Sequence, residues 1–188
     1  MAIEPTVRFA KNAQRRGVRE VVCSDLETAQ FKPGALCAVG MFDVLEHIRD
    51  DLDYLRFLRS LMPRGGLLYC AVPAWNFLWS REDETIGHFR RYSVARLNDV
   101  VTQAGFGICY HTYYFAALLL PILLLRSIPS RLGIRPPRTT ASTRREHVLQ
   151  PSLVATVMER SLAWELGRVE RGGDCAYGAS CFVVARAL

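Results

Sequence analysis

The chain has 188 residues, half of them hydrophobic, which is enough to bury one core and too little for two. Charged residues make up 22% and aromatic residues 10%, so the composition excludes a disordered or fibrous protein. The net charge is +6 at pH 7, but the excess comes from six arginines without an acidic residue at positions 126–145. Such a local excess does not predict a nucleic-acid-binding face.

In the first half of the chain, short apolar runs alternate with helix-like stretches. This is the pattern of β-α-β units and a largely parallel sheet. Strands are predicted at Ala2–Glu4, Glu20–Ser24, Leu36–Phe42 and Leu67–Val72, with helices at Thr6–Arg16 and after the capping pair Asp50 and Asp51. The run Leu36–Phe42 is nearly all apolar, which favours a strand covered on both faces.

The second half begins with a helix capped by Ser93 and ended by Gly105. Four further segments follow in order: a strand at Phe106–Tyr113, an apolar run at Phe115–Leu125, an irregular basic loop at Ile128–Thr143 and an amphipathic helix at Ser152–Glu170. A last strand is predicted at Ser180–Ala187. We therefore expect one domain over residues 1–188, with residues 114–150 as an inserted apolar helix and basic loop.

The spacing of the cysteines indicates whether the chain binds a metal, and the N-terminal residues indicate its cellular compartment. The six cysteines form no Cys-x-x-Cys pair and no cluster at zinc-ligand spacing, so reduced thiols and no metal are expected. The N-terminus has no apolar run behind a basic start, which predicts a cytoplasmic protein.

Acidic residues follow three successive strands, at Glu4, Asp25 and Asp43. A carboxylate at the carboxyl end of such a strand can accept hydrogen bonds from both hydroxyls of a ribose. Asp25 beside Leu26 suits a purine, whose amine the acid binds while the leucine packs on the ring. Each residue alone also fits an exposed strand end or a turn. The spacing of the three acids favours a nucleotide-like ligand.

Three motifs in order resemble class I methyltransferases that use S-adenosylmethionine: FDVLEHIRDD (42–51), LMPRGGLLYCAVPA (61–74) and GHFRRYSVARLNDVVTQAGF (87–106). The resemblance covers nearly the whole chain. It implies an α/β, Rossmann-like, doubly wound sheet that is mostly parallel, with an antiparallel last strand. It also implies S-adenosylmethionine as cofactor and methyl transfer to a small-molecule or lipid-linked acceptor.

The resemblance assigns five residues to the cofactor. Glu4 matches the ribose-binding acid, Asp25 and Leu26 match the pair that contacts adenine, and Phe42 and Asp43 match the strand end beside the sulfonium.

Four further residues are implied at the methyl-transfer pocket. His47 matches a residue that lines it, and His88, Arg91 and Tyr92 are expected to close over the acceptor rather than pair locally. Two alternatives remain: His47 caps a helix start, or the acids at 82–84 pair with the neighbouring arginines.

The sequence departs from the family in one place, because no Gly-x-Gly-x-Gly precedes Glu4. The first strand and its glycine loop are thus expected to be missing, through a missed upstream start, a truncated gene or supply by another chain. Two alternative functions follow: a non-catalytic, decayed binding module, or a nicotinamide-dependent oxidoreductase. The second is disfavoured, since no Tyr-x-x-x-Lys pair is present.

The segment Phe115–Arg145 joins an apolar run to the six arginines. Eleven apolar residues cannot cross a bilayer, which needs about twenty. A peripheral contact with the inner face of the membrane is one interpretation. The others are a buried helix followed by a solvated loop, and arginines that receive a phosphorylated or lipid-linked acceptor.

Overall fold

The computed structural model describes residues 1–134 and 153–188. The elements of the first half, in chain order, are β1 (Ala2–Ile3), α1 (Val7–Arg15), β2 (Val21–Val22), β3 (Ala38–Phe42), the 3₁₀ turn η1 (Leu45–His47), α2 (Asp51–Ser60), β4 (Leu67–Pro73), η2 (Asn76–Leu78) and α3 (Arg81–Thr85). Then follow α4 (Val94–Gln103), β5 (Phe106–Tyr114), α5 (Ala116–Ile122), the π-helical turn η3 (Leu123–Ser127), α6 (Ile128–Arg131), α7 (Leu153–Glu170) and β6 (Ser180–Ala187).

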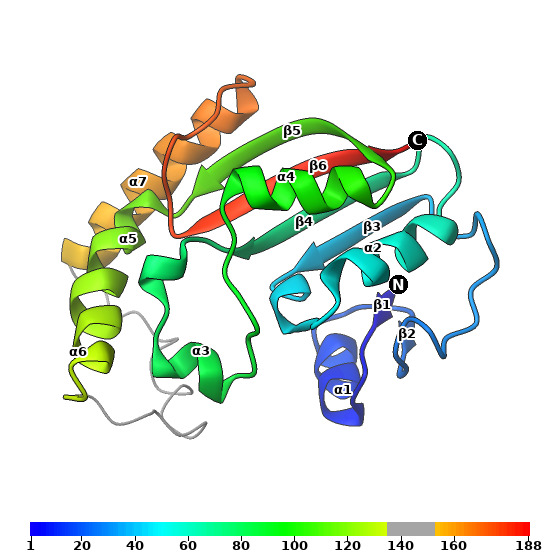
Figure 1. Cartoon of the computed structure of the whole chain (residues 1–188), viewed down its shortest axis with the longest axis horizontal. Helices are drawn as coiled ribbons and strands as arrows, with labels where there is room; N and C mark the ends of the chain where they lie inside the picture. The colour runs from blue at the N-terminus through cyan, green and yellow to red at the C-terminus, as the bar shows by residue number, and fades with distance from the viewer. Residues whose placement is uncertain (135–152) are drawn as a thin grey trace.

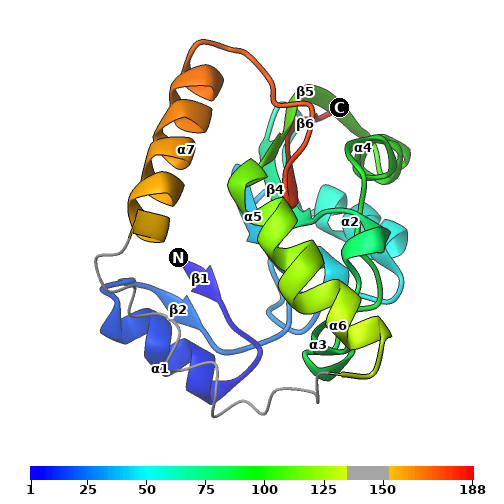
Figure 2. The same ribbon diagram turned by 90° about the vertical axis from the view of Figure 1, so that its left-hand side faces the viewer.

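The larger sheet has the strand order β3-β4-β6-β5. Strand β3 runs parallel to β4, whereas β6 is antiparallel to both β4 and β5, so the predicted antiparallel last strand is confirmed. Helices α2 and α4 cover one face of this sheet (Figure 1), and α7 lies on its other side (Figure 2). The architecture is the predicted mixed α/β one.

The core lies between this sheet and the two helices that cover it. Leucines recur at helical spacing in α2 and bury one side of the helix, while alternate residues of β4 and β6 face them. Fully buried apolar side chains include Leu55, Leu58, Leu68, Val72, Leu97, Val101 and Phe106. Each such side chain contributes about 1.5–3 kcal/mol to stability. This layer holds the carboxyl ends of β3 and β4 in place.

Strands β1 and β2 form a separate, parallel, two-stranded sheet. Within the described residues, β1 pairs only with β2 and β3 only with β4, so one edge of each carries unpaired backbone groups. The expectation that β3 is covered on both faces is wrong: only Met41 is buried, and Phe42 is 61% exposed. The physical reason is that only one face of β3 packs on the core: Val39 and Met41 point to it, whereas the alternating residues Ala38, Gly40 and Phe42 are exposed.

The helical segment after β5 follows the predicted apolar run but differs in two ways. Residues 128–131, predicted as loop, are helical, because Pro129 lies in the first turn, where its missing N–H is not needed. No residue of α5 or α6 is buried. Among the described helices, none is long and apolar enough to cross a membrane. Most of the predicted basic loop, residues 135–143, lies outside the described residues.

The amphipathic pattern of residues 152–170 predicts that the leucines of α7 face inward, but Leu166 is 59% exposed. Glu165 is buried instead, and its carboxylate accepts hydrogen bonds from the backbone N–H groups of Phe115 and Ala116, both at 2.8 Å. A carboxylate at a helix N-terminus satisfies donors that have no partner within the helix. The polar contact with α5 therefore decides which side of α7 faces inward.

Candidate functional site

The carboxyl ends of β1 and β2 bring Glu4 and Asp25 to one edge of the small sheet. Glu4 N donates to Val22 O at 2.9 Å, and Ser24 N donates to Glu4 O at 3.1 Å, so the two chain exits are adjacent. Neither the Glu4 nor the Asp25 carboxylate has a hydrogen-bond or ion-pair partner within residues 1–134 and 153–188. Both acids are free to accept from a ligand.

The other cofactor residues lie where the sequence places them, at strand ends. Leu26 is buried, and Asp43 directly follows β3 with a left-handed backbone at φ 54°, which few non-glycine residues adopt. Burial raises the pKa of Asp43, while the charges of His88 and His47 lower it in part. No hydrogen bond or ion pair between described residues joins Asp43 to Glu4 or Asp25. The acids thus form two groups. Glu4 and Asp25 follow the strands of the small sheet, and Asp43 follows β3 of the larger sheet.

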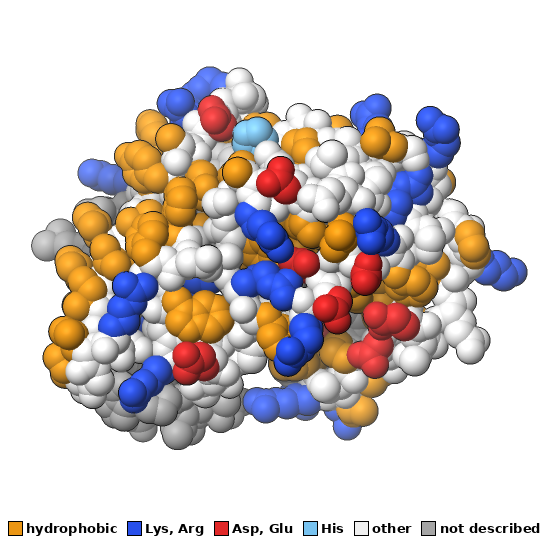
Figure 3. Space-filling view, in the orientation of Figure 1, with side chains coloured by type: hydrophobic (Ala, Val, Ile, Leu, Met, Phe, Trp, Pro, Cys, Tyr) orange, Lys and Arg blue, Asp and Glu red, His pale blue; other side chains and the backbone are white. Residues whose placement is uncertain are grey.

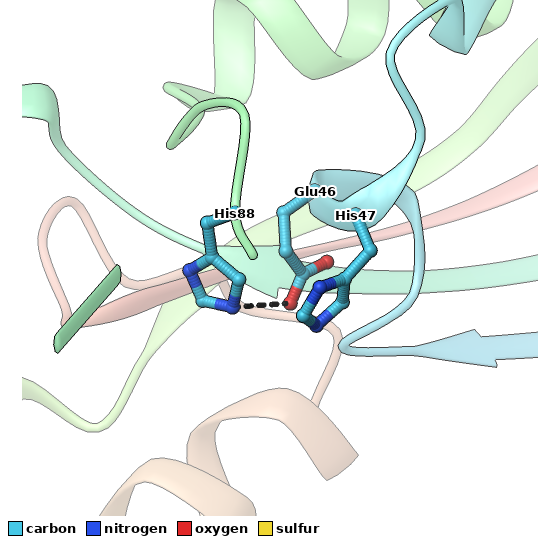
Figure 4. A group of neighbouring side chains, drawn as sticks. All are labelled: Glu46, His47 and His88. Atoms are coloured by element: carbon cyan, nitrogen blue, oxygen red, sulfur yellow. Dashed lines mark ion pairs between the residues drawn. The ribbon is translucent and has the colours of Figure 1, made fainter. Parts of the chain in front are cut away.

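His47 and His88 meet next to Glu46, as Figure 4 shows, and the charges of both histidines act on Asp43. Their ring centroids are 4.6 Å apart in an edge-to-face arrangement. His47 Nδ1 lies 3.3 Å from Gly87 O, and His88 Nδ1 lies 3.0 Å from Asp83 Oδ1. Burial, and then the charge of His88, lower the pKa of His47. The contact with Gly87 O agrees with the alternative in which a helix-start histidine is satisfied by the backbone, and a role of His47 in the methyl-transfer pocket stays a prediction.

Glu46 completes this cluster and was not among the predicted residues. Its side chain is fully buried, and neither carboxylate oxygen has a hydrogen-bond partner among the described residues. His88 Nε2 lies 3.7 Å from Glu46 Oε1. Burial raises the pKa of Glu46 to about 7. Its position within the FDVLEH motif, between two predicted site residues, is the signal that would have identified it.

Arg91 pairs locally, contrary to the prediction that it is free to receive an acceptor. Its Nε and Nη2 both donate to Asp83 Oδ1 at 2.8 Å, and Nη1 donates to Ala74 O at 3.2 Å. The alternative interpretation, in which the acids at 82–84 pair with this loop, is the correct one for Arg91. The cause is burial: a guanidinium 4% exposed needs its carboxylate partner.

Tyr92 is likewise engaged within the protein. It is fully buried, and its hydroxyl donates to Asp51 Oδ2 at 2.8 Å. Arg90 Nη1 lies 2.6 Å from the same oxygen. Burial, together with the hydrogen bond to Asp51, raises the pKa of Tyr92. Tyr92 and Arg91 therefore hold the loop that carries His88, and any contact of theirs with an acceptor stays a prediction.

Asp83 is the centre of a larger network. Its carboxylate also accepts from Ser80 N at 2.9 Å and pairs with Arg126 Nη2 at 3.2 Å. Arg126 in turn pairs with Glu82 at 2.8 Å. Despite desolvation, the hydrogen bond with His88 and the charges of Arg91 and Arg126 hold the pKa of Asp83 far below its usual range. The network joins η3 to α3. Arg126, the first of the six arginines at positions 126–145, therefore stabilises the fold.

Solved structures of methyltransferases resemble this chain over nearly its whole length. A methyltransferase of Archaeoglobus fulgidus that depends on S-adenosylmethionine matches 98% of this chain with 74% of its own length, at a TM-score of 0.57 and 14% identity. A second such methyltransferase, from Thermotoga maritima, matches 99% of this chain with 72% of its own, at a TM-score of 0.54 and 18% identity. This chain has the methyltransferase fold.

The methyltransferase fold does not by itself decide the reaction. A [4+2]-cyclase matches 95% of this chain with 61% of its own length, at a TM-score of 0.50 and 14% identity. No protein-family model matches the sequence, and no curated protein matches it either. Function must therefore be argued from the site.

Proposed function

We propose that this protein transfers a methyl group from S-adenosylmethionine to a small-molecule or lipid-linked acceptor. The observation that carries the proposal is the pair of unpartnered carboxylates, Glu4 and Asp25, at the carboxyl edge of parallel strands in a methyltransferase fold. Glu4 is half-buried and Asp25 is exposed, and ligands of open α/β sheets bind at this edge, outside the carboxyl ends of the strands.

The residues of this chain fit part of the cofactor. In this proposal Glu4 accepts from ribose hydroxyls, and Asp25 and the buried Leu26 contact the adenine; their adjacent positions after β1 and β2 support it. No glycine-rich turn for the methionine part is present in the sequence. When bound, the cofactor supplies an activated methyl group on a sulfonium, so positioning and charge are the protein's main contributions. Asp43, with His47 next to it, faces that centre in this proposal.

Charge-to-neutral substitution of Glu4 tests the proposal. Glu4→Gln should weaken S-adenosylmethionine binding by about ten- to a hundredfold, because a hydrogen bond to a charged group contributes about 1.5–3 kcal/mol. Glu20→Gln is the matched control, since Glu20 precedes β2 at the opposite end of the same sheet. Calorimetric titration of both variants, with unfolding followed in parallel, gives the answer. Equal affinities in the two variants would remove Glu4 from the site.

The non-catalytic alternative rests on one observation, the unpaired edges of β1 and β3. A strand between them would complete one continuous sheet and bring the two groups of acids together. If the 188-residue chain does not bind S-adenosylmethionine, the decayed binding module becomes the better proposal.

A peripheral membrane contact through α5, η3 and α6 is our second proposal, and exposed leucines favour it over the buried-helix interpretation. Five apolar residues here are 56 to 70% exposed: Leu120, Leu124, Leu125, Leu132 and Ile134. Hydrophobic side chains gather where α5 and α6 lie, at the left of Figure 3. Arg131 lies in the same segment, so apolar and cationic groups are adjacent, as an anionic surface requires.

Vesicle binding tests this contact. Replacing Leu120 and Leu124 together by glutamine should weaken binding to anionic vesicles by about tenfold or more, because each buried leucine contributes about 1.5–3 kcal/mol. Val7→Gln, on exposed α1, is the control. Co-sedimentation is measured with and without anionic lipid, at low and high salt. Binding that the double variant retains, or the absence of binding in every condition, would contradict the proposal.

A further inference from the structure

Glu46, His47 and His88 converge in space although His88 is distant in the sequence. One potential ligand atom from each residue lies within 4.8 Å of the other two. Figure 4 shows the three side chains directed at a common point between η1 and the loop that carries His88. Cysteine and histidine spacing along the chain cannot reveal this group, because it is assembled by the fold.

The state of the Glu46 carboxylate is the second observation. It is fully buried, and within the part of the chain that the structure describes neither oxygen has a hydrogen-bond partner. Leaving a buried acceptor unsatisfied costs about 1–3 kcal/mol, and more when the group is charged. Nearly all such groups in folded proteins have a partner, which can be an ion. A cation at the centre of the cluster would satisfy Glu46.

The surroundings of the two histidines match those of metal ligands. Imidazoles that bind metals usually donate their other ring N–H to a carboxylate or a backbone carbonyl. His88 Nδ1 contacts the Asp83 carboxylate at 3.0 Å, and His47 Nδ1 contacts the Gly87 carbonyl at 3.3 Å. Asp83 is itself held by Arg91 and Arg126. Each ring is thus oriented with its second nitrogen left for a ligand.

We propose that Glu46, His47 and His88 bind a divalent transition-metal ion through two imidazole nitrogens and one carboxylate oxygen. This ligand set suits zinc and its neighbours, and less so magnesium or calcium, which prefer oxygen ligands. Bonds of about 2.0–2.2 Å need the donors somewhat closer together than they lie here, and the exposed His47 side chain is free to close that distance. Three protein ligands leave a position open beside Asp43. The proposal rests on these residues alone and not on methyl transfer.

Titration of the whole chain with Co²⁺ alone tests the site. We expect one ion per chain, with visible absorption that reports histidine and carboxylate ligation. Glu46→Gln and His47→Ala should each weaken this binding by at least about tenfold. Glu46→Gln keeps the shape of the side chain, and His47 is exposed, so both variants should fold.

His111→Ala is the matched control, because His111 is exposed and its ring nitrogen Nδ1 forms a hydrogen bond with Asn98 Nδ2, at 3.1 Å. The exposed thiols of Cys23, Cys37 and Cys109 are common to all variants and cancel in the comparison. Binding that Glu46→Gln and His47→Ala leave intact would overturn the proposal. So would the absence of any Co²⁺ binding, or a loss in His111→Ala as large as that in His47→Ala. Cofactor affinity, measured separately, distinguishes failure here from failure of the proposed function.

Discussion

Replacing Asp83 by alanine should lower the free energy of unfolding by about 3–5 kcal/mol, because it leaves a buried cation without its partner. Arg91 is 4% exposed and directs two N–H groups at Asp83. The substitution also removes the acceptor for His88 and for the backbone of Ser80. In a chain of this size the melting temperature should fall by on the order of 10 °C.

The control for Asp83→Ala is Glu84→Ala, one residue along α3. Glu84 is exposed, and its one described contact is with Trp79 Nε1 at 3.3 Å. A surface substitution of this kind changes stability by about 0.5 kcal/mol or less. If the two variants unfold at the same temperature, Asp83 does not organise the loop that carries His88 and Arg91.

The pH dependence of stability should carry a large contribution from Glu46. Its pKa is raised from 4.5 to about 7 in the folded protein. The folded state therefore holds a proton that the unfolded state releases, and stability falls as pH rises between these two values and is constant above them. The loss amounts to about 3 kcal/mol.

The measurement compares denaturant unfolding of the unaltered protein and Glu46→Gln at a series of pH values, with a chelator present. The neutral amide cannot ionise, so the difference between the two curves isolates Glu46 from Asp83 and His47. We expect Glu46→Gln to gain stability relative to the unaltered protein as pH rises from 4.5 to about 7, with no further gain above that pH. Curves that stay parallel from pH 4.5 to 7 would show that Glu46 is not desolvated. Glu84→Gln should leave the curve unchanged.

The elements of the fold could be predicted from local signals, because capping residues and periodicity act over a few residues. Thr6 and Ser93 cap their helices, and Gly105 has the left-handed backbone of a helix end. Local signals also mark where the strands end, and so predict that Glu4 and Asp43 follow β1 and β3. Exposure could not be predicted in this way. Phe42 in β3 is exposed because coverage of a strand depends on neighbours that the local pattern does not contain.

The candidate site was predicted only in part, since its polar contacts join distant segments. Arg91 meets Asp83 on α3, and Glu46 meets His88 from another loop. Residue type alone makes Arg91 look like an anion-binding group, and only the three-dimensional structure shows that its donors are occupied. The reverse holds for Glu46. Its place in an apolar motif does not indicate that its carboxylate oxygens lack hydrogen-bond partners among the described residues.

The most direct test of the proposed function is competition between S-adenosylmethionine and adenosine for the unaltered chain. In the proposed function Glu4 contacts the ribose, and Asp25 and Leu26 contact the adenine. The sequence has no glycine-rich turn for the methionine part. Equilibrium dialysis with labelled S-adenosylmethionine should therefore show one saturable site, from which adenosine displaces the label at a concentration within about tenfold of the unlabelled cofactor. No saturable binding, or binding that adenosine cannot displace, would contradict the account.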